Sequence, residues 1–199
     1  MKIEPISIKL NSNKDIKPRF GKNFSKTLKE VNIGTLPCGI IGKIRVLKSN
    51  GQVVLLNLEK SVLSSMEIYR LKDNFDNEIG KIEFTIRKNS NLISSKNSNH
   101  VFVNELRNYS NPNTPYYKKG LDEYKQVGTR LIQIAQKRSY ESSCNGNIEL
   151  IAKNEDFVLN FYKKLGFVQP AQITRFDNPY RLHLKDDAKD FLANLYNGI

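Results

Sequence analysis

The chain has 199 residues, a hydrophobic fraction of 39% and a formal net charge of +12, from 32 basic and 20 acidic residues. This length and composition indicate one globular domain with a sizeable core, and they exclude a disordered chain. No apolar run approaches the roughly 18 residues needed to span a bilayer. The start, MKIEPISIKLNSNKD, lacks the continuous apolar core of a secretory signal. We therefore expect a cytoplasmic protein with no membrane partner.

Metal binding is not expected. Cys38 and Cys144 lie far apart in the sequence, and the chain has only two histidines, His100 and His183, which have no evident partner. Zinc ligands usually come in closely spaced Cys or His pairs, so this spacing argues against a zinc site. We predict a reduced protein without a metal, and we assign no nucleophilic role to Cys144.

The positive charge has two interpretations. It could attract RNA, a ribosome or another polyanion. It could also reflect a Lys-rich composition, because the basic residues are spread along the chain and no Arg-rich tract or aromatic RNA-binding signature accompanies them. The second interpretation is favoured, and a phosphorylated cofactor would also use some of this charge.

The first half of the chain after residue 38 predicts paired strands. Runs 39–48 and 52–60 flank Ser49-Asn50-Gly51, and an Asn-Gly pair between β-rich runs is a strong hairpin signal. Runs 65–73 and 78–88 are separated by a polar turn, which suggests a second hairpin.

A polar loop and another strand follow. The loop covers 88–99, and the strand 100–110 has Val101 and Val103 on one face. The Pro- and Asn-rich segment 109–120 is long for a connection within a compact domain. It is therefore a candidate functional loop.

Helical spacing begins after Lys125. One apolar face is predicted from Val127, Leu131, Ile134, Ala135 and Arg138. Asn145-Gly146 ends this helix, and 147–152 alternates as a strand. Asn154 is a good N-cap for a second helix, with an apolar stripe at Phe157, Phe161 and Leu165 and a C-terminal Gly166.

The last part of the chain predicts two strands, 167–176 and 180–185, and a short amphipathic helix capped by Asp186 or Asp187. Together these elements predict an α+β fold with a mixed, mostly antiparallel central sheet and flanking helices. We expect a polar, basic extension over 1–36, a folded domain over 37–185 and the C-terminal helix over 186–199.

The turn Lys125-Gln126-Val127-Gly128-Thr129-Arg130 is a candidate phosphate site. Amides at a helix start are unsatisfied and carry partial positive charge, so they bind phosphate oxygens. Gly128 permits close backbone approach, Thr129 adds a hydroxyl, and Lys125 and Arg130 supply charge. A single glycine at a helix start is more often simple punctuation.

The turn and helix, the strand 147–152, the Asn154 helix and the run FYKKLGF together resemble the GCN5-related N-acetyltransferase (GNAT) family. The match covers roughly residues 100–168. The resemblance implies a GNAT-like (acyl-CoA N-acyltransferase) fold, acetyl-CoA as co-substrate, and an amine acceptor that is a small molecule or a protein. Direct acetyl transfer in a ternary complex would follow.

The resemblance also implies roles for individual residues. The amides from Val127 to Arg130, including Gly128, would face the pyrophosphate of acetyl-CoA. Asn154 matches an Asn that contacts the pantetheine arm, although it would serve as a cap in either case. The strand segment 101–105 corresponds to the one whose splayed end holds the cofactor's amide groups.

Tyr162 matches the Tyr that protonates the leaving thiolate, and a phenol with a pKa near ~10 is protonated at pH 7. The alternative is a packed aromatic residue on an amphipathic helix. Glu105 is a candidate general base for the amine, the alternative being a solvent-facing strand carboxylate.

Two positions depart from the family pattern. Gln126 stands where the family usually has its first Gly, and Glu123 stands where Gln or Arg is expected. The usual pair of helices after the first strand is also not evident. The rival hypothesis is therefore a non-catalytic protein on the same scaffold that docks to RNA, a ribosome or an acidic protein. The oligomeric state, monomer or dimer, stays open.

Overall fold

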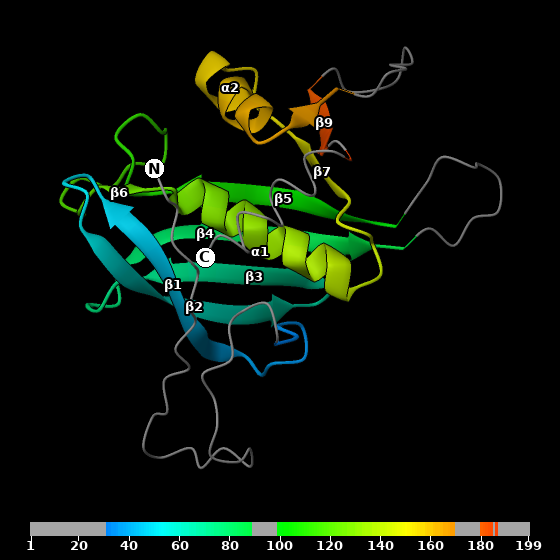
Figure 1. Ribbon diagram of the computed structural model, residues 1–199, viewed down its shortest axis with the longest axis horizontal. Coiled ribbons are helices and arrows are strands. Elements are labelled where there is room, and N and C mark those ends of the chain that lie inside the picture. The colour runs from blue at the N-terminus through cyan, green and yellow to red at the C-terminus, as the bar shows by residue number, and fades with distance from the viewer. Residues whose placement is uncertain (1–30, 89–98, 170–179, 185, 187–199) are drawn as a thin grey trace.

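The computed structural model describes residues 31–88, 99–169, 180–184 and 186. These residues form a mixed sheet of nine strands in the order β6-β1-β2-β3-β4-β5-β7-β9-β8, with two helices (Figure 1). The elements are, in chain order, β1 (Gly39–Lys48), β2 (Val53–Leu63), β3 (Met66–Lys72), β4 (Glu78–Arg87), β5 (His100–Asn108), β6 (Tyr124–Lys125), α1 (Val127–Glu141), β7 (Ile148–Ile151), α2 (Asp156–Lys164), β8 (Phe167–Val168) and β9 (Arg181–Leu184). The predicted α+β class with a mostly antiparallel sheet is confirmed.

Strands β1 to β5 form a continuous antiparallel meander. The first predicted hairpin is confirmed, and Gly51 has φ 85°, a left-handed conformation that glycine adopts without a steric penalty. Strand β2 runs to Leu63, so a tight turn also joins it directly to β3. The meander contains no helix between β1 and β2, as the hairpin-rich pattern indicated.

Helix α1 lies across one face of the meander (Figure 1). Side chains alternate along the strands, so one set from each strand faces this helix. The buried set includes Ile44, Leu58, Tyr69, Ile82 and Phe84, which pack with the predicted apolar face of α1 in one core.

The chain order β5–α1–β7 is a parallel crossover. Strands β5 and β7 pair at three positions only, the last being Val103 with Leu150. Beyond that point β5 continues to Asn108, whereas β7 ends at Ile151. A β-bulge in β5 also falls at Asn104, where the register against β4 shifts. The two parallel strands therefore stop pairing halfway along β5.

The described end of the predicted N-terminal extension packs on the domain. Ile33 is buried in the core. The Lys60 ammonium donates to the carbonyl oxygens of Ile33, Gly34 and Leu36 at 3.2, 2.6 and 2.8 Å. The Glu141 carboxylate accepts the amides of Ile33 and Gly34 at 2.9 and 3.0 Å. Residues 32–36 are thus strapped to β2 and to the end of α1.

The predicted N-cap of the second helix is wrong. Helix α2 begins at Asp156, and Glu155 occupies the N-cap position in an extended conformation without a side-chain hydrogen bond. Asn154 is exposed and lies one residue further out. The C-terminal end agrees with expectation, because Gly166 follows the helix with φ 87°.

Several expectations fall wholly or partly outside the described residues. They concern most of the extension 1–36, most of the loop 88–99, residues 170–176 of the first final strand, and the C-terminal helix 186–199 apart from Asp186. What is described of the two final strands is the antiparallel pair β8 and β9.

Candidate functional site

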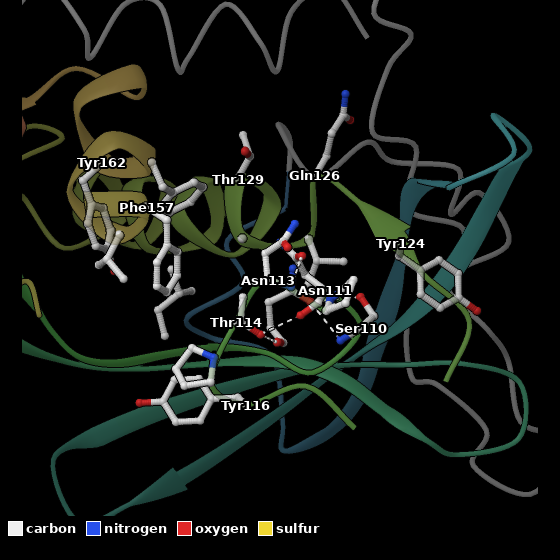
Figure 2. A pocket seen from close by; sticks show the side chains of 18 of the residues that line it. Ser110, Asn111, Asn113, Thr114, Tyr116, Tyr124, Gln126, Thr129, Phe157 and Tyr162 are labelled. Atoms are coloured by element: carbon white, nitrogen blue, oxygen red, sulfur yellow. Dashed lines mark hydrogen bonds between the residues drawn. The ribbon is translucent and has the colours of Figure 1, made fainter. Parts of the chain in front are cut away.

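A cavity of about 760 Å³ opens where β5 and β7 stop pairing (Figure 2). Four parts of the chain and Ser49 line it: residues of the end of β5 between Asn104 and Asn108 other than Arg107, the loop 110–116, the turn from β6 into α1, and the segment from β7 into α2. Its size is ordinary for a site that binds a small molecule or cofactor. The two halves of the sequence pattern, the Gly128 turn and the Tyr162 helix, therefore border one space.

The start of α1 brings backbone donors to this cavity. The first helical hydrogen bond runs from the Arg130 amide to the Gln126 carbonyl at 2.9 Å. The amides of Val127, Gly128 and Thr129 precede it, so they have no acceptor within the helix, and all three residues line the cavity. Three such amides at the positive end of a 15-residue helix are groups that can bind an anion.

Gln126, which stands where the family pattern has a glycine, adopts a left-handed conformation. Its φ and ψ are 68° and 4°, in the left-handed region. A side chain with a Cβ is strained there, at a cost of about 1–3 kcal/mol. The turn therefore holds Gln126 in a backbone conformation that favours glycine, and in Figure 2 its side chain points away from the loop that carries Asn111 and Asn113.

Gly128 lies close to a neighbouring aromatic ring. A Cβ at this position would lie 3.0 Å from Cζ of Phe161 in α2, which is tighter than most real contacts. The sequence predicted that Gly128 would let a ligand approach the backbone closely. In the structure the Phe161 ring makes such a close approach to Gly128. It joins the start of α1 to α2 and so holds the two ends of the cavity together.

The expected contribution of Arg130 is not found. Its side chain is 4% exposed, does not line the cavity and donates to Gln133 Oε1 at 3.1 Å. Its amide closes the first turn of α1, so the cavity receives three amides and not four. Lys125 and Thr129 both line the cavity, and Lys125 is exposed.

Tyr162 lies at the α2 side of the cavity with 7% of its surface exposed. Its ring makes edge contacts with Phe161 and Phe167, at centroid distances of 5.1 and 5.5 Å. No hydrogen bond to its hydroxyl is found among the residues that the structure describes. Burial, and to a lesser degree the nearby Tyr116, raise the pKa of Tyr162 well above its ordinary value. The phenol is therefore a permanent hydrogen-bond donor.

Glu105 lines the cavity but is held by two cations. Lys81 Nζ lies 2.9 Å from one carboxylate oxygen, and Arg107 pairs with the other. Partial burial alone would raise the pKa of Glu105, yet the hydrogen bonds from Lys81 and Arg107 outweigh burial and leave that pKa below its ordinary value. A carboxylate stabilised in this way is a weaker base than the free group.

The remaining candidate residues lie elsewhere. Asn154 does not line the cavity, whereas Lys153 and Phe157 on either side of it do. His100 Nε2 lies 3.7 Å from Glu149, and His183 pairs with Glu149 in the β7–β9 register. Cys144 is buried, and burial raises its thiol pKa.

Tyr116 is one of the lining residues that the sequence did not predict. The Arg107 guanidinium lies 4.9 Å and the Lys153 ammonium 5.1 Å from the centroid of its ring. The available signal was the length of segment 109–120, which contains it. The connection from β5 to α1 is held in place by β6, which pairs with β1, and by the Lys48–Asp122 ion pair at 2.5 Å.

Comparison with known proteins gives similarity at the level of solved structures. No protein-family model matches the chain, and no curated protein sequence does. Similar solved structures include a protein assigned as an acyl-CoA N-acyltransferase from Klebsiella pneumoniae, with 8% identity, a TM-score of 0.41 and coverage of 60% of this chain and 70% of the other. An acetyltransferase of the GNAT family from Staphylococcus aureus has 16% identity, a TM-score of 0.40 and coverage of 60% and 66%. Tetrahymena GCN5 has 17% identity, a TM-score of 0.36 and coverage of 61% and 69%.

These neighbours belong to the class of proteins that the sequence motifs resemble. Identities and TM-scores at this level describe a similarity of fold only, so the functional argument rests on the chain's own cavity. Within the described ranges, no helix is long and apolar enough to cross a membrane. The same residues contain no cluster of three or more His, Cys, Asp or Glu side chains that could hold a metal ion.

Proposed function

We propose that the chain is an N-acyltransferase that transfers an acetyl group from acetyl-CoA directly to an amine acceptor in a ternary complex. One observation carries this proposal: a single cavity extends from the three free amides of α1 to the buried phenol of Tyr162. The first feature suits the pyrophosphate, and the second suits the sulfur. The proposed enzyme is cytoplasmic and uses acetyl-CoA without a metal ion.

The pantetheine arm would lie along the free edge of β5. Beyond Val103, β5 pairs with β4 on one side and has no β7 partner on the other. Backbone N–H and C=O groups along an unpaired strand edge are ready hydrogen-bonding partners for an extended chain. Asn104 to Leu106 line the cavity along this edge. The arm's amide groups would bind there and direct the thioester toward Tyr162.

The reaction forms a bond between the acceptor nitrogen and the acetyl carbon and breaks the C–S bond. The acceptor loses one proton, and the departing thiolate gains one. Tyr162 would donate a hydrogen bond to the sulfur as negative charge develops there. The ordinary pKa of a phenol, ~10, already exceeds that of a thiol, ~8.5, and burial raises the pKa of Tyr162 further, so stabilisation of the thiolate contributes more than complete proton transfer. Orientation of the two substrates would supply much of the remaining rate.

The two other predicted site residues have reduced parts in this proposal. Glu105 would contribute mainly charge and position, since two cations hold its carboxylate. Asn154 would reach the pantetheine arm only after a change in its side-chain position, because it does not line the cavity.

Isothermal titration with acetyl-CoA is the direct test. We expect binding in the micromolar range, and acetyl-pantetheine, which lacks the pyrophosphate and nucleotide, should bind at least tenfold more weakly. Lys125→Met should weaken acetyl-CoA binding, whereas Lys163→Met, an exposed lysine outside the cavity, should not. Absence of binding at millimolar acetyl-CoA would refute the proposal.

A non-catalytic protein that docks to RNA, a ribosome or an acidic protein is the second candidate. The net charge of +12 favours it, as do Glu123 and Gln126 at the turn. Against it, many described cations are already paired, including Lys72, Lys81, Arg70 and Arg138. A salt-dependent RNA shift without thiol release from acetyl-CoA would support this candidate. No polyanion binding at low salt would remove it, and sedimentation would separate monomer from dimer.

A further inference from the structure

The charges that line the cavity are unevenly distributed. Two carboxylates line it among the described residues, Glu105 and Glu123. Glu105 is engaged by Lys81 and Arg107. Glu123 is exposed and immediately precedes β6, so it belongs to the end of the cavity near α1. The end near Tyr162 therefore offers no free carboxylate from the described part of the chain.

The end near Tyr162 instead carries positive charge. Lys153 lines the cavity there, is exposed, and makes no ion pair within the described ranges. Its ammonium lies 5.1 Å from the Tyr116 ring, and the Arg107 guanidinium lies 4.9 Å from the same ring. Tyr116 is close enough to Tyr162 to act on it electrostatically. Arg107 is paired with Glu105 and does not line the cavity, so Lys153 is the cation that this end of the cavity offers to a ligand.

This distribution decides between acceptor chemistries. A polyamine brings a second ammonium group, which would meet Lys153 with no free carboxylate to offset the repulsion. An amine that also carries a carboxylate places its anion beside Lys153, where a charge-assisted hydrogen bond is favourable. The aromatic side chains of Tyr116 and Phe157 would contact the apolar part of such a molecule.

We propose that the acyl acceptor is a small amino acid-type molecule, whose amine is acetylated beside Tyr162 while its carboxylate is bound by Lys153. This inference rests on the proposed function. The reaction is the acetyl transfer described above. The amine nitrogen takes the acetyl group and loses a proton, and the thiolate leaves and is protonated. The carboxylate takes no part in bond making and serves only to orient the amine.

Matched ligand pairs test the inference. Binding is measured by isothermal titration to the full chain with coenzyme A present, so that no acetyl group can be transferred. The pairs are lysine with cadaverine, ornithine with putrescine, tyrosine with tyramine and phenylalanine with phenethylamine, and each differs only in the carboxylate. We expect at least one amino acid to bind tenfold or more tightly than its decarboxylated partner.

Variants identify the binding group. Lys153→Met keeps the side-chain length and removes the charge, so it should reduce the preference for the carboxylate from tenfold toward onefold. Lys163→Met is the matched control and should retain the preference. In steady-state assays, Lys153→Met should raise KM for the amino acid with little change in KM for acetyl-CoA.

Two results would overturn the inference. The first is that the amine binds as tightly as its amino acid in every pair, which includes pairs in which neither binds at millimolar concentration. The second is a preference for the carboxylate that survives Lys153→Met. Neither result would affect acetyl-CoA binding. Conversely, failure of acetyl-CoA to bind would refute the proposed enzyme while leaving the carboxylate preference measurable. The two failures are therefore distinguishable.

Discussion

At the scale of single residues, the environment of Tyr162 determines what its hydroxyl can do. Burial between Phe161 and Phe167 holds the ring in one position and raises the pKa of its phenol. A raised pKa keeps the proton on the oxygen throughout the neutral range. The group is therefore suited to hydrogen bonding to a developing thiolate, in contrast to Glu105, whose two cations lower its basicity.

Tyr162→Phe tests this role. The change removes the hydroxyl and leaves the ring contacts, so we expect kcat for acetyl transfer to fall by about 10²-fold, the lower end of general acid–base effects. The Kd for acetyl-CoA, measured by titration, should change little. Tyr117→Phe is the control, because Tyr117 belongs to the same region of the chain as Tyr116 but does not line the cavity. Unchanged turnover in Tyr162→Phe would assign Tyr162 to packing alone.

At the scale of elements, the turn from β6 into α1 combines a strained residue with a useful arrangement of amides. Gln126 at φ 68° precedes three residues whose amides have no acceptor within the helix and which line the cavity. Gly128 among them lies against the Phe161 ring of α2. The proposed anion site and the phenol therefore adjoin one junction between two helices.

Gln126→Gly should stabilise the protein. Glycine adopts φ 68° without a Cβ clash, and after allowance for its greater freedom in the unfolded chain we expect a gain of about 1 kcal/mol in the free energy of unfolding. Chemical denaturation measures this change. Gln52→Gly is the matched control: Gln52 does not have a positive φ, so glycine there should be neutral or destabilising. A loss of stability in Gln126→Gly would show that its side-chain contact with Arg130 outweighs the strain.

At the scale of the whole molecule, one buried ionic network joins distant parts of the chain. Arg138 of α1 donates to both carboxylate oxygens of Glu67 in β3, at 2.8 and 2.6 Å. It also donates to Glu141 at 2.8 Å, and Glu141 binds the strap at residues 32–36. Tyr69 adds a hydrogen bond to Glu67 at 2.8 Å. The network thus ties α1, the sheet and the strap together.

Arg138→Met should be strongly destabilising. It leaves two carboxylates without their main partner in a buried setting, and breaking a buried ion pair from one side typically costs about 3–5 kcal/mol. Urea unfolding measures the loss, with Lys163→Met as the control for removal of an exposed charge. A change below about 1 kcal/mol, the size typical of surface pairs, would contradict this account of the network.

Stability should also fall in acid. Burial alone would raise the pKa of Glu67, but hydrogen bonds from Arg138 and Tyr69 leave it below its ordinary value of 4.5. A carboxylate whose pKa is lower in the folded than in the unfolded protein stabilises the fold when the pH is above the pKa of the unfolded state. This contribution is lost as the pH falls through the pKa of the folded state. We expect the melting temperature to drop as the pH falls below 4.5. Glu67→Gln should lower stability at neutral pH and make this dependence shallower, and an unchanged dependence would exclude Glu67 as its source.

Much of the local structure was determined by the sequence itself. Asn50-Gly51 specified the first hairpin, the spacing from Val127 to Arg138 specified α1, and Gly166 marked the end of α2. Such signals depend on a few neighbouring residues, so they can be interpreted without knowing the fold. The prediction of Asn154 as the N-cap was wrong, because the helix begins one residue later and Glu155 occupies the N-cap position without a side-chain hydrogen bond.

The tertiary structure alone decided what the site contains. The early end of β5–β7 pairing, the pairing of Glu105 with Lys81 and Arg107, and the position of Tyr116 beside Lys153 all join segments that are distant in the chain. Local pattern carries no information on which distant side chains meet, because those contacts depend on strand order and packing. The sequence by itself therefore determined the elements and the motif residues of this protein, while the folded sheet decided which charges and which hydroxyl share its cavity.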